Sequence, residues 1–338
     1  MSGPPPAVAA VRVAVRVDLR AVAADHPGGL VLVACSGGAD ALALAAAVAV
    51  EAPRLGLRAG AVTVDHGLHA ASAAVAAAVE ETLRTRLRLD PVVLATVRVG
   101  RTGGPEGAAR EARYAALHEE ADRLGACAVL LGHTLEDQAE TVLLGLGRGS
   151  GTRSLAGMPA VRGLLRRPLL GVDRAVVRAA VPGPVLFEDP ANADPRLARS
   201  RVRHDALPAL ERALGPGTAR ALARSARAAR DDADALDALA ADLHVFTDEP
   251  GGRSAAVADL LAPPAALRRR LLRAAALAVG CPAGSLTSAH VDAVDALLLD
   301  WHGQGAVHLP GGASARRACG RLSVWTPRPP GQTSSTSS

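Results

Sequence analysis

A short turn near the N-terminus combines residue types that bind phosphate. The loop Ser36 to Gly38 follows an apolar run, residues 30–35, and precedes Asp40 and an Ala- and Leu-rich stretch. This order predicts a strand, a tight loop and a helix start, where unpaired N–H groups and the helix dipole favour an anion. The carboxylate of Asp40 suits a Mg²⁺ ion that bridges phosphates. The alternative is an ordinary glycine-rich turn, because the Gly-Lys-Ser/Thr ending of a Walker A sequence is missing.

An acidic stretch in the middle of the chain is a second candidate site. Asp137, Glu140 and Thr141 are three and four residues apart, so a helix places them on one face. Two carboxylates on one face can converge on one cationic ligand. The alternative is a helix start that is rich in acids because of the macrodipole. That alternative explains Glu136 and Asp137 but not the whole run.

Two smaller polar groups complete the candidate chemistry. Arg110 and Arg113 are three residues apart, and their guanidinium groups suit phosphate and a nucleobase carbonyl. On an unrelated helix the same pair would be solvated surface. Asp65, His66 and His69 follow another apolar run, where contact with a nucleotide is favoured and a metal site is the alternative.

The elements that must position these groups alternate along the chain. The predicted strands are residues 30–35, 57–64, 91–99 and 128–131, and the predicted helices between and after them are 70–87, 106–124 and 136–146. This alternation predicts an α/β fold, a doubly wound parallel sheet with helices on both faces. Ligands bind such sheets at the carboxyl ends of the strands. Each polar group above falls at such an end or in the helix that follows.

Charge and cysteine content narrow the function classes. The chain has 338 residues and a net charge of +5, and all 38 of its basic residues are arginine. Nine arginines lie between residues 196 and 230, which favours a polyanionic partner, with a solvated charged surface as the alternative. The four cysteines lie far apart, which argues against a zinc ribbon, an iron–sulfur site or a disulfide framework. Because signal-peptide and membrane-span patterns are also missing, we expect a soluble, cytoplasmic protein.

The motifs together resemble those of the tRNA(Ile)-lysidine synthetases, members of the PP-loop ATP pyrophosphatase superfamily. Residues 36–41 are similar to S-G-G-x-D-S, and residues 64–69 to V-D-H-G-L-R. Residues 106–114 are similar to E-A-x-A-R-x-x-R-Y, and residues 132–141 with 148–151 to G-H-x-x-D-D-Q-x-E-T and R-G-S-G. Segments 167–170, 188–192 and 199–203 resemble R-P-L-L, E-D-x-S/T-N and R-N-x-V/I-R. The sequence departs from these patterns at Ala41, His69, Glu136 and Ser200.

The resemblance implies a two-step reaction that uses ATP and Mg²⁺. The O2 atom of the wobble cytidine in the CAU anticodon of tRNA(Ile) attacks the α-phosphate of ATP, and the ε-amine of L-lysine then displaces AMP at C2. The products are lysidine, AMP and pyrophosphate. The partners implied are tRNA(Ile) and lysine, with no membrane, and the sequence leaves open whether the chain forms a homodimer.

The resemblance also assigns roles to residues. The expected catalytic residues are Asp40, Arg113, Asp137 and Glu140, and Asp40 is the expected metal ligand. The residues expected to contact ATP are Ser36, Gly37, Gly38, Ala39, Asp40, Ala41, Asp65, His66 and His133. The residues expected to contact lysine or tRNA are Arg110, Arg113, Glu136, Asp137, Glu140, Thr141, Arg148, Arg199, Arg201 and Arg203.

The expected domains are an N-terminal helical extension (1–28), a PP-loop catalytic domain (29–210), a mainly helical tRNA-binding domain with a small β element (211–326) and a disordered tail (327–338). Two alternatives stay open. One is another PP-loop tRNA-modifying enzyme that uses the same adenylation. The other is a catalytically impaired paralogue that binds tRNA or a nucleotide, which is favoured because Ala41, His69 and Glu136 depart from the family pattern together.

Overall fold

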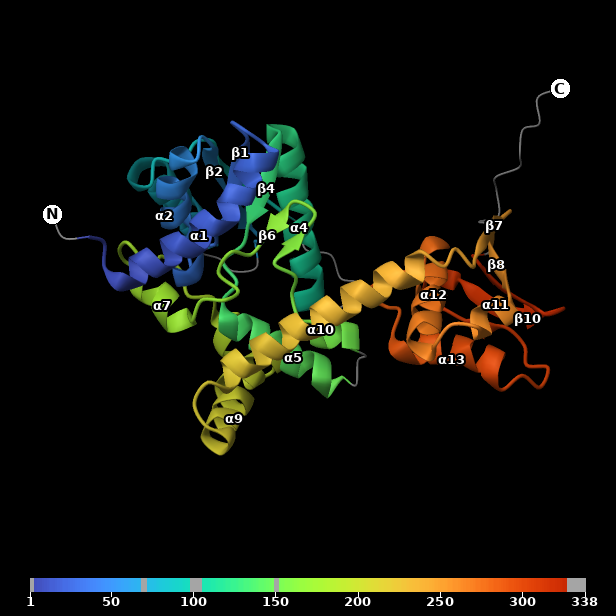
Figure 1. Cartoon of the computed structure of the whole chain (residues 1–338). Helices are drawn as coiled ribbons and strands as arrows, with labels where there is room; N and C mark the ends of the chain where they lie inside the picture. The colour runs from blue at the N-terminus through green and yellow to red at the C-terminus, as the bar shows by residue number, and fades with distance from the viewer. Residues whose placement is uncertain (1–2, 68–71, 98–104, 149–151, 327–338) are drawn as a thin grey trace, which may run out of the picture. The chain divides into compact units, whose positions relative to one another are not determined.

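The computed structural model describes residues 3–67, 72–97, 105–148 and 152–326 (Figure 1). His69, residues 149–151 and the tail 327–338 lie outside this part of the chain. Contacts divide the chain into a first unit, residues 1–147 and 156–227, and a second unit, residues 148–155 and 228–338. The boundary at residue 227 falls inside helix α10 (Thr218–Ala241), beyond the expected domain boundary at 210.

A six-stranded sheet forms the centre of the first unit, in the order β3-β2-β1-β4-β6-β5. Its strands are β1 (Leu30–Ala34), β2 (Arg58–Asp65), β3 (Val92–Thr96), β4 (Ala126–Leu130), β5 (Val161–Arg162) and β6 (Leu165–Arg166). All neighbours pair in parallel except β5, which runs antiparallel to β6. The predicted parallel sheet is therefore confirmed. The β5–β6 hairpin was not predicted, because two-residue strands leave no periodic pattern.

Both faces of the sheet are covered by helices, as predicted for a doubly wound fold. Val31 and Val33 of β1 belong to one core cluster, whereas Leu30 and Leu32 belong to another, as expected for alternating side chains. Contributing to the first cluster are α1 (Pro6–Asp25), α2 (Ala39–Arg54), α3 (Ser72–Glu81) with the π-helical turn η1 (Thr82–Arg86), and α7 (Arg174–Ala179). Helix α4 (Pro105–Leu124) covers the opposite face (Figure 1).

Helix α5 (Leu135–Gly147) follows β4 and carries the acidic stretch. The later elements are α6 (Thr152–Leu155), the 3-10 turn η2 (Pro190–Ala193), α8 (Ala198–Arg201), the π-helical turn η3 (Val202–Ala206) and α9 (Leu207–Leu214). Leu207 of α9 and Ala219 of α10 are buried in one cluster with Leu135 and Ala139 of α5. This cluster holds the arginine-rich segment before α9 against the acidic helix.

The expected N-terminal extension is an integral part of the first unit. Val15 and Leu19 of α1 are fully buried in the core. The side chain of Glu51 on α2 is also fully buried, and its carboxylate accepts hydrogen bonds from Arg12 Nε at 2.6 Å and Arg16 Nε at 2.7 Å. The bond from Arg16, assisted by Arg12, lowers the pKa of Glu51 to about 2. The ion pairs therefore join α1 to α2.

We expect the Glu51 ion pairs to make stability depend on pH in the acid range. Because the pKa of Glu51 is lowered from 4.5, its contribution is present above pH 4.5 and is lost as the pH falls towards about 2. Glu51→Gln should lower the free energy of unfolding at pH 7 by about 3 kcal/mol, since it breaks a buried ion pair. Urea denaturation at several pH values measures both effects. The control is Glu80→Gln, which removes an exposed pair with Arg84 and should cost less than about 1 kcal/mol. Equal losses in both variants would contradict this interpretation.

The second unit contains a five-stranded antiparallel sheet in the order β7-β8-β11-β10-β9. Its strands are β7 (Thr247–Glu249), β8 (Gly252–Ala256), β9 (Val307–His308), β10 (Ser314–Ala318) and β11 (Arg321–Trp325). Its helices are α11 (Val257–Leu261), α12 (Ala265–Ala278) and α13 (Ser288–Leu299), and a 3-10 turn, η4 (Pro310–Gly312), precedes β10. A buried ion pair, Arg268 Nε to Asp295 Oδ1 at 2.6 Å, joins α12 to α13. The predicted β element is thus larger than expected.

No helix in the described residues is long and apolar enough to cross a membrane.

Candidate active site

The loop after β1 has the geometry of an anion site. Gly37 has a φ of +83°, and a Cβ atom there would lie 2.5 Å from Val79 Cγ2. Its carbonyl oxygen accepts hydrogen bonds from the backbone N–H groups of Leu186 and Phe187, both at 3.2 Å. Gly38 is the N-cap of α2 and has no side chain to cap the helix. The first N–H groups of α2 therefore remain available to a bound anion.

We expect alanine to be tolerated at Gly38 but not at Gly37. Gly37→Ala combines a left-handed backbone with a clash, so it should lower the free energy of unfolding by about 1–3 kcal/mol and abolish ATP binding. Gly38→Ala is the matched control, because its backbone has a φ of −72° and its nearest neighbour would lie 3.7 Å from the new Cβ. Thermal melts and ATP titration of both variants test the difference. Equal stability of the two variants would contradict the proposed role of the Gly37 backbone.

The phosphate loop, Ser36–Gly38, contains one side-chain hydroxyl, that of Ser36. Ser36 Oγ lies 3.7 Å from the position that a Cβ atom of Gly38 would take. Ala41, in the first turn of α2, has no hydroxyl where the family pattern has a serine. Ser36 is therefore the side-chain donor that this loop offers to a phosphate.

Asp40, in the same turn of α2, carries a carboxylate with an unused acceptor. Its Oδ1 atom is buried and has no hydrogen-bond partner among the described residues, while Oδ2 lies 3.9 Å from Arg174 Nε. Burial raises the pKa of Asp40 to about 6. A buried carboxylate oxygen without a partner fits a cation ligand. Because the described part of the chain holds no group of three or more His, Cys, Asp or Glu residues suited to a metal, phosphate oxygens and water would supply the further ligands.

The loop and the acidic helix meet at the point where the sheet order reverses. Strands β2 and β3 lie to one side of β1, while β4 and β6 lie to the other. Gly132 follows β4, and a Cβ atom there would lie 3.1 Å from the carbonyl carbon and oxygen of Asp40. The backbone after β4 thus contacts the first turn of α2. Ligands of open parallel sheets bind at this kind of switch point.

The acid pair, Asp137 and Glu140 of α5, is held by three arginines. Nη2 atoms of Arg174, Arg199 and Arg203 lie 2.9, 3.1 and 3.0 Å from Asp137 Oδ1. Glu140, whose side chain is fully buried, accepts bonds from Arg174 Nη2 at 3.2 Å, Arg199 Nε at 2.9 Å and Arg203 Nε at 2.7 Å. We call Arg174, Arg199 and Arg203 the arginine cluster. Sequence reasoning placed Arg199 and Arg203 on a polyanion and did not consider Arg174.

The arginine cluster keeps Asp137 ionised. Burial alone would raise the pKa of Asp137, but Arg174, Arg199 and the N–H of Thr134 lower it to about 2. The other oxygen of Asp137 accepts bonds from the N–H of Thr134 at 2.7 Å and from its hydroxyl at 3.0 Å. Three guanidinium groups surround the two carboxylates of the pair, and a third carboxylate, that of Asp40, lies 3.9 Å from Arg174.

The other residues predicted to contact lysine or tRNA in this part of the chain make local contacts and do not bind the carboxylates of the acid pair. Glu136 Oε2 accepts a bond from the backbone N–H of Arg174 at 2.8 Å, so its side chain caps the start of α7. Thr141 donates its hydroxyl to the carbonyl of Asp137 at 2.7 Å. Arg201 is exposed and donates to the carbonyls of Pro195 and Arg196, both at 2.8 Å. Arg148 belongs to the second unit.

A second group of predicted residues lies between β2 and α4. Asp65 Oδ1 accepts a bond from the backbone N–H of Gly67 at 2.9 Å, which fixes the turn after β2. His66 Nε2 accepts a bond from Arg113 Nε at 3.2 Å, and burial together with Arg113 lowers the pKa of His66. Arg110 lies over the ring of Tyr114, 4.9 Å from its centroid. A neutral histidine thus orients one guanidinium and an aromatic ring orients the other.

His133, after β4, is neutral as well. Burial lowers its pKa to about 3, and Nδ1 has no hydrogen-bond partner among the described residues. The imidazole can therefore donate one hydrogen bond to a ligand, or accept one from it, without carrying charge.

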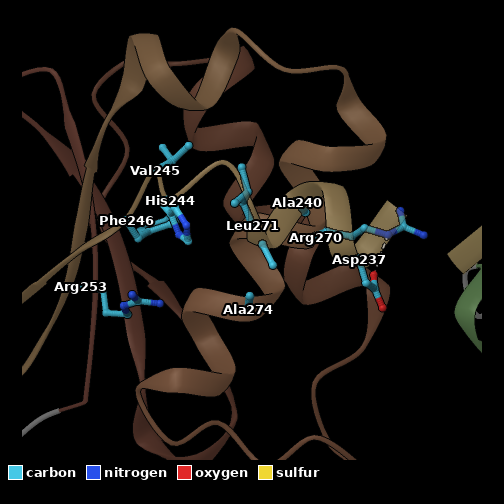
Figure 2. A pocket seen from close by; sticks show the side chains of 10 residues that line it. Asp237, Ala240, His244, Val245, Phe246, Arg253, Arg270, Leu271 and Ala274 are labelled. Atoms are coloured by element: carbon cyan, nitrogen blue, oxygen red, sulfur yellow. Dashed lines mark hydrogen bonds and ion pairs between the residues drawn. The ribbon is translucent and has the colours of Figure 1, made fainter. Parts of the chain in front are cut away.

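A pocket of about 350 Å³ lies in the second unit, lined by the end of α10, α12 and β8 (Figure 2). Phe246 and Leu271 supply apolar surface, and Arg270 and Arg253 lie on opposite sides. Arg270 Nε is 2.7 Å from Asp237 Oδ1, and Arg253 Nε is 2.6 Å from Asp248 Oδ1. Because both guanidinium groups are already paired, the pocket gives no clear indication of a ligand.

Comparison with known proteins shows to which class of enzyme the chain belongs. Residues 12–210 match the PP-loop domain, and residues 256–323 match the TilS substrate binding domain. Among solved structures, the U34-tRNA thiolase NcsA from Methanococcus maripaludis is similar in fold, with a TM-score of 0.53 and 18% identity over 65% of this chain and 78% of that chain. The chain is therefore a PP-loop enzyme, a ligase that uses ATP.

Sequence relatives then assign the family. The tRNA(Ile)-lysidine synthase of Thermobifida fusca is 57% identical, over 96% of this chain and 99% of that protein. The tRNA(Ile)-lysidine synthase of Streptomyces coelicolor is 54% identical, over 95% of this chain and 99% of that protein. This chain belongs to the tRNA(Ile)-lysidine synthase family.

Proposed function

We propose that this chain attaches L-lysine to C2 of the wobble cytidine in tRNA(Ile), in two steps and with ATP as the activating substrate. The observation that carries the proposal is that the phosphate loop and the acid pair share the β1–β4 switch point, where Gly132 contacts the backbone of Asp40. Activation of a base and attack by an amine need both ligands in one place, because proximity replaces a bimolecular encounter.

The first step is activation of cytidine by transfer of the adenylyl group of ATP to its O2 atom. The N–H groups of Gly38 and the first turn of α2, together with the Ser36 hydroxyl, bind the triphosphate and stabilise charge on the departing pyrophosphate. Arg113, held by neutral His66, faces the cytidine or the adenylate and offers planar donors to a carbonyl or a phosphate.

Asp40 would hold Mg²⁺ in this step, since its buried Oδ1 lacks another partner in the described residues. When bound, the ion would neutralise charge on the phosphates.

The second step is attack of the lysine amine on the activated ring. The acid pair receives the ammonium group and orients it, and a proton must leave, because the pKa of a free lysine amine is about 10.4. The carboxylates of the acid pair stabilise the ammonium form, so one of them has to accept the proton before the neutral amine attacks C2 and the bond from C2 to the AMP oxygen breaks. AMP then leaves from C2, and lysidine remains on the tRNA.

The test is incorporation of labelled lysine into a tRNA(Ile) transcript with a CAU anticodon. We expect incorporation that requires ATP and is lost when the wobble cytidine is replaced by uridine. Binding of tRNA without AMP release would instead indicate a non-catalytic paralogue. Incorporation of sulfur or ammonia in place of lysine would indicate another PP-loop reaction.

A further inference from the structure

Arg174 contacts both halves of the candidate active site. Its guanidinium binds the acid pair through Nη2, at 2.9 Å from Asp137 and 3.2 Å from Glu140, while its Nε lies 3.9 Å from Asp40 Oδ2. Among the three members of the arginine cluster, only Arg174 has an ion pair with Asp40 in the described residues. It therefore links the phosphate loop to the acid pair.

The acid pair has no vacant acceptor for a cationic ligand in this state. Every carboxylate oxygen of the pair already accepts a hydrogen bond, and Arg174 contacts both carboxylates. A lysine ammonium would have to displace one of these guanidinium groups, which costs free energy at low dielectric. If Arg174 left, acceptor positions on Asp137 and Glu140 would become available, and two arginines would remain beside two carboxylates.

We propose that Arg174 is a positioning residue that couples ATP binding to lysine binding. The triphosphate at the Ser36–Gly38 loop draws the guanidinium of Arg174 away from the acid pair, which then accepts the lysine ammonium. This inference rests on the proposed function, because it takes ATP and lysine as the two ligands.

The neighbours of Arg174 explain why it moves and the other two arginines stay. A triphosphate carries several negative charges and offers a guanidinium paired oxygens. Arg174 is the member of the arginine cluster that lies beside Asp40. Asp40 belongs to the first turn of α2, whose N–H groups are available to the phosphates. Its backbone N–H is fixed by Glu136, so the side chain can turn while the start of α7 stays in place. Arg199 and Arg203 lie on a different segment, α8 and η3.

Linkage requires the coupling to be reciprocal. Lysine should raise the affinity for ATP by the same factor by which ATP raises the affinity for lysine. The amine then occupies the site mainly when the group that activates the base is present.

The experiment is calorimetric titration of lysine into the full chain, alone and with α,β-methylene-ATP and Mg²⁺. We expect the analogue to lower the Kd for lysine about tenfold, within the usual range of coupling between sites. Arg174→Gln removes the guanidinium that occupies both carboxylates of the acid pair, so it should bind lysine without the analogue about tenfold more tightly than the parent chain does. Adding the analogue should then change its Kd less than twofold.

Arg178→Gln is the matched control. Arg178 lies on the same short helix, is largely exposed and reaches Glu188 only at 4.0 Å, so its removal takes one charge from α7 without touching the acid pair. We expect it to keep the tenfold effect of the analogue. Arg174→Lys is a second variant that keeps the charge, and it should bind lysine weakly in the absence of the analogue, as the parent chain does.

The outcomes separate this inference from the function on which it rests. Weaker lysine binding by Arg174→Gln without the analogue would make Arg174 a direct lysine ligand and overturn the inference. An undiminished effect of the analogue in Arg174→Gln would also overturn it while leaving the proposed function intact. If Arg174→Gln does not fold, tight lysine binding by Arg174→Lys without the analogue would count against the coupling. A parent chain that binds neither ligand would overturn both the proposed function and the inference.

Discussion

Asp137→Asn should reduce lysine incorporation about 100-fold, because truncating one partner of a buried charge pair costs several kcal/mol. Asp137 is ionised, with a pKa lowered to about 2, and all three members of the arginine cluster contact its Oδ1. The neutral amide would remove one negative charge from the acid pair, so the loss should be in lysine binding. Transfer of the ATP α-phosphate to tRNA should persist, since the phosphate loop is unchanged.

Labelled lysine and ATP labelled at the α-phosphate measure the two steps in parallel. Glu136→Gln is the control on the same helix, because a glutamine oxygen can still accept the hydrogen bond from the N–H of Arg174. We expect that control to incorporate lysine at nearly the parent rate. If Asp137→Asn lost adenylation and lysine incorporation equally, the acid pair would not be a site for the second step alone.

Ser36→Ala should lower kcat/KM for ATP about 10- to 100-fold, the range expected when a donor to a charged group is lost. The hydroxyl of Ser36 lies beside Gly38 at the N-terminus of α2, and Ala41 supplies no second hydroxyl in that turn. Binding of the ATP phosphates should therefore depend on Ser36 more than it would if residue 41 were a serine.

Ala41→Ser provides the matched rescue. Introduced with Ser36→Ala, it should restore part of the lost activity, and introduced alone it should raise kcat/KM for ATP. Initial rates of AMP release at several ATP concentrations measure all four combinations. Strictly additive effects would show that the two hydroxyls do not share one phosphate.

Local sequence was sufficient to predict the phosphate loop and the layers of the first unit. Ser36 to Asp40 are contiguous, so the strand, loop and helix start follow from residue types alone. The parallel sheet followed from alternating strands and helices. The sequence of α1 also carries a signal for its burial, since Val11, Val15, Leu19 and Val22 recur at helical spacing and are all buried.

The surroundings of the acid pair could not be predicted in the same way. Arg174, Arg199 and Arg203 lie 34, 59 and 63 residues from Glu140 along the chain. Their contacts depend on how the irregular segments around α7 and α8 pack, and these segments have no periodic pattern. The sheet of the second unit was underestimated for a related reason: β7 consists of three exposed residues, Thr247–Glu249, without an apolar face.

The most direct test of the central claim is to follow the α-phosphate of ATP through both steps. The claim is that the phosphate loop and the acid pair act on one tRNA base at one switch point. Incubated with labelled ATP and tRNA(Ile) in the absence of lysine, the chain should place label on the tRNA. Adding lysine should release that label as AMP, one molecule for each lysine incorporated. Label that never reaches the tRNA, or that lysine does not release, would contradict the account.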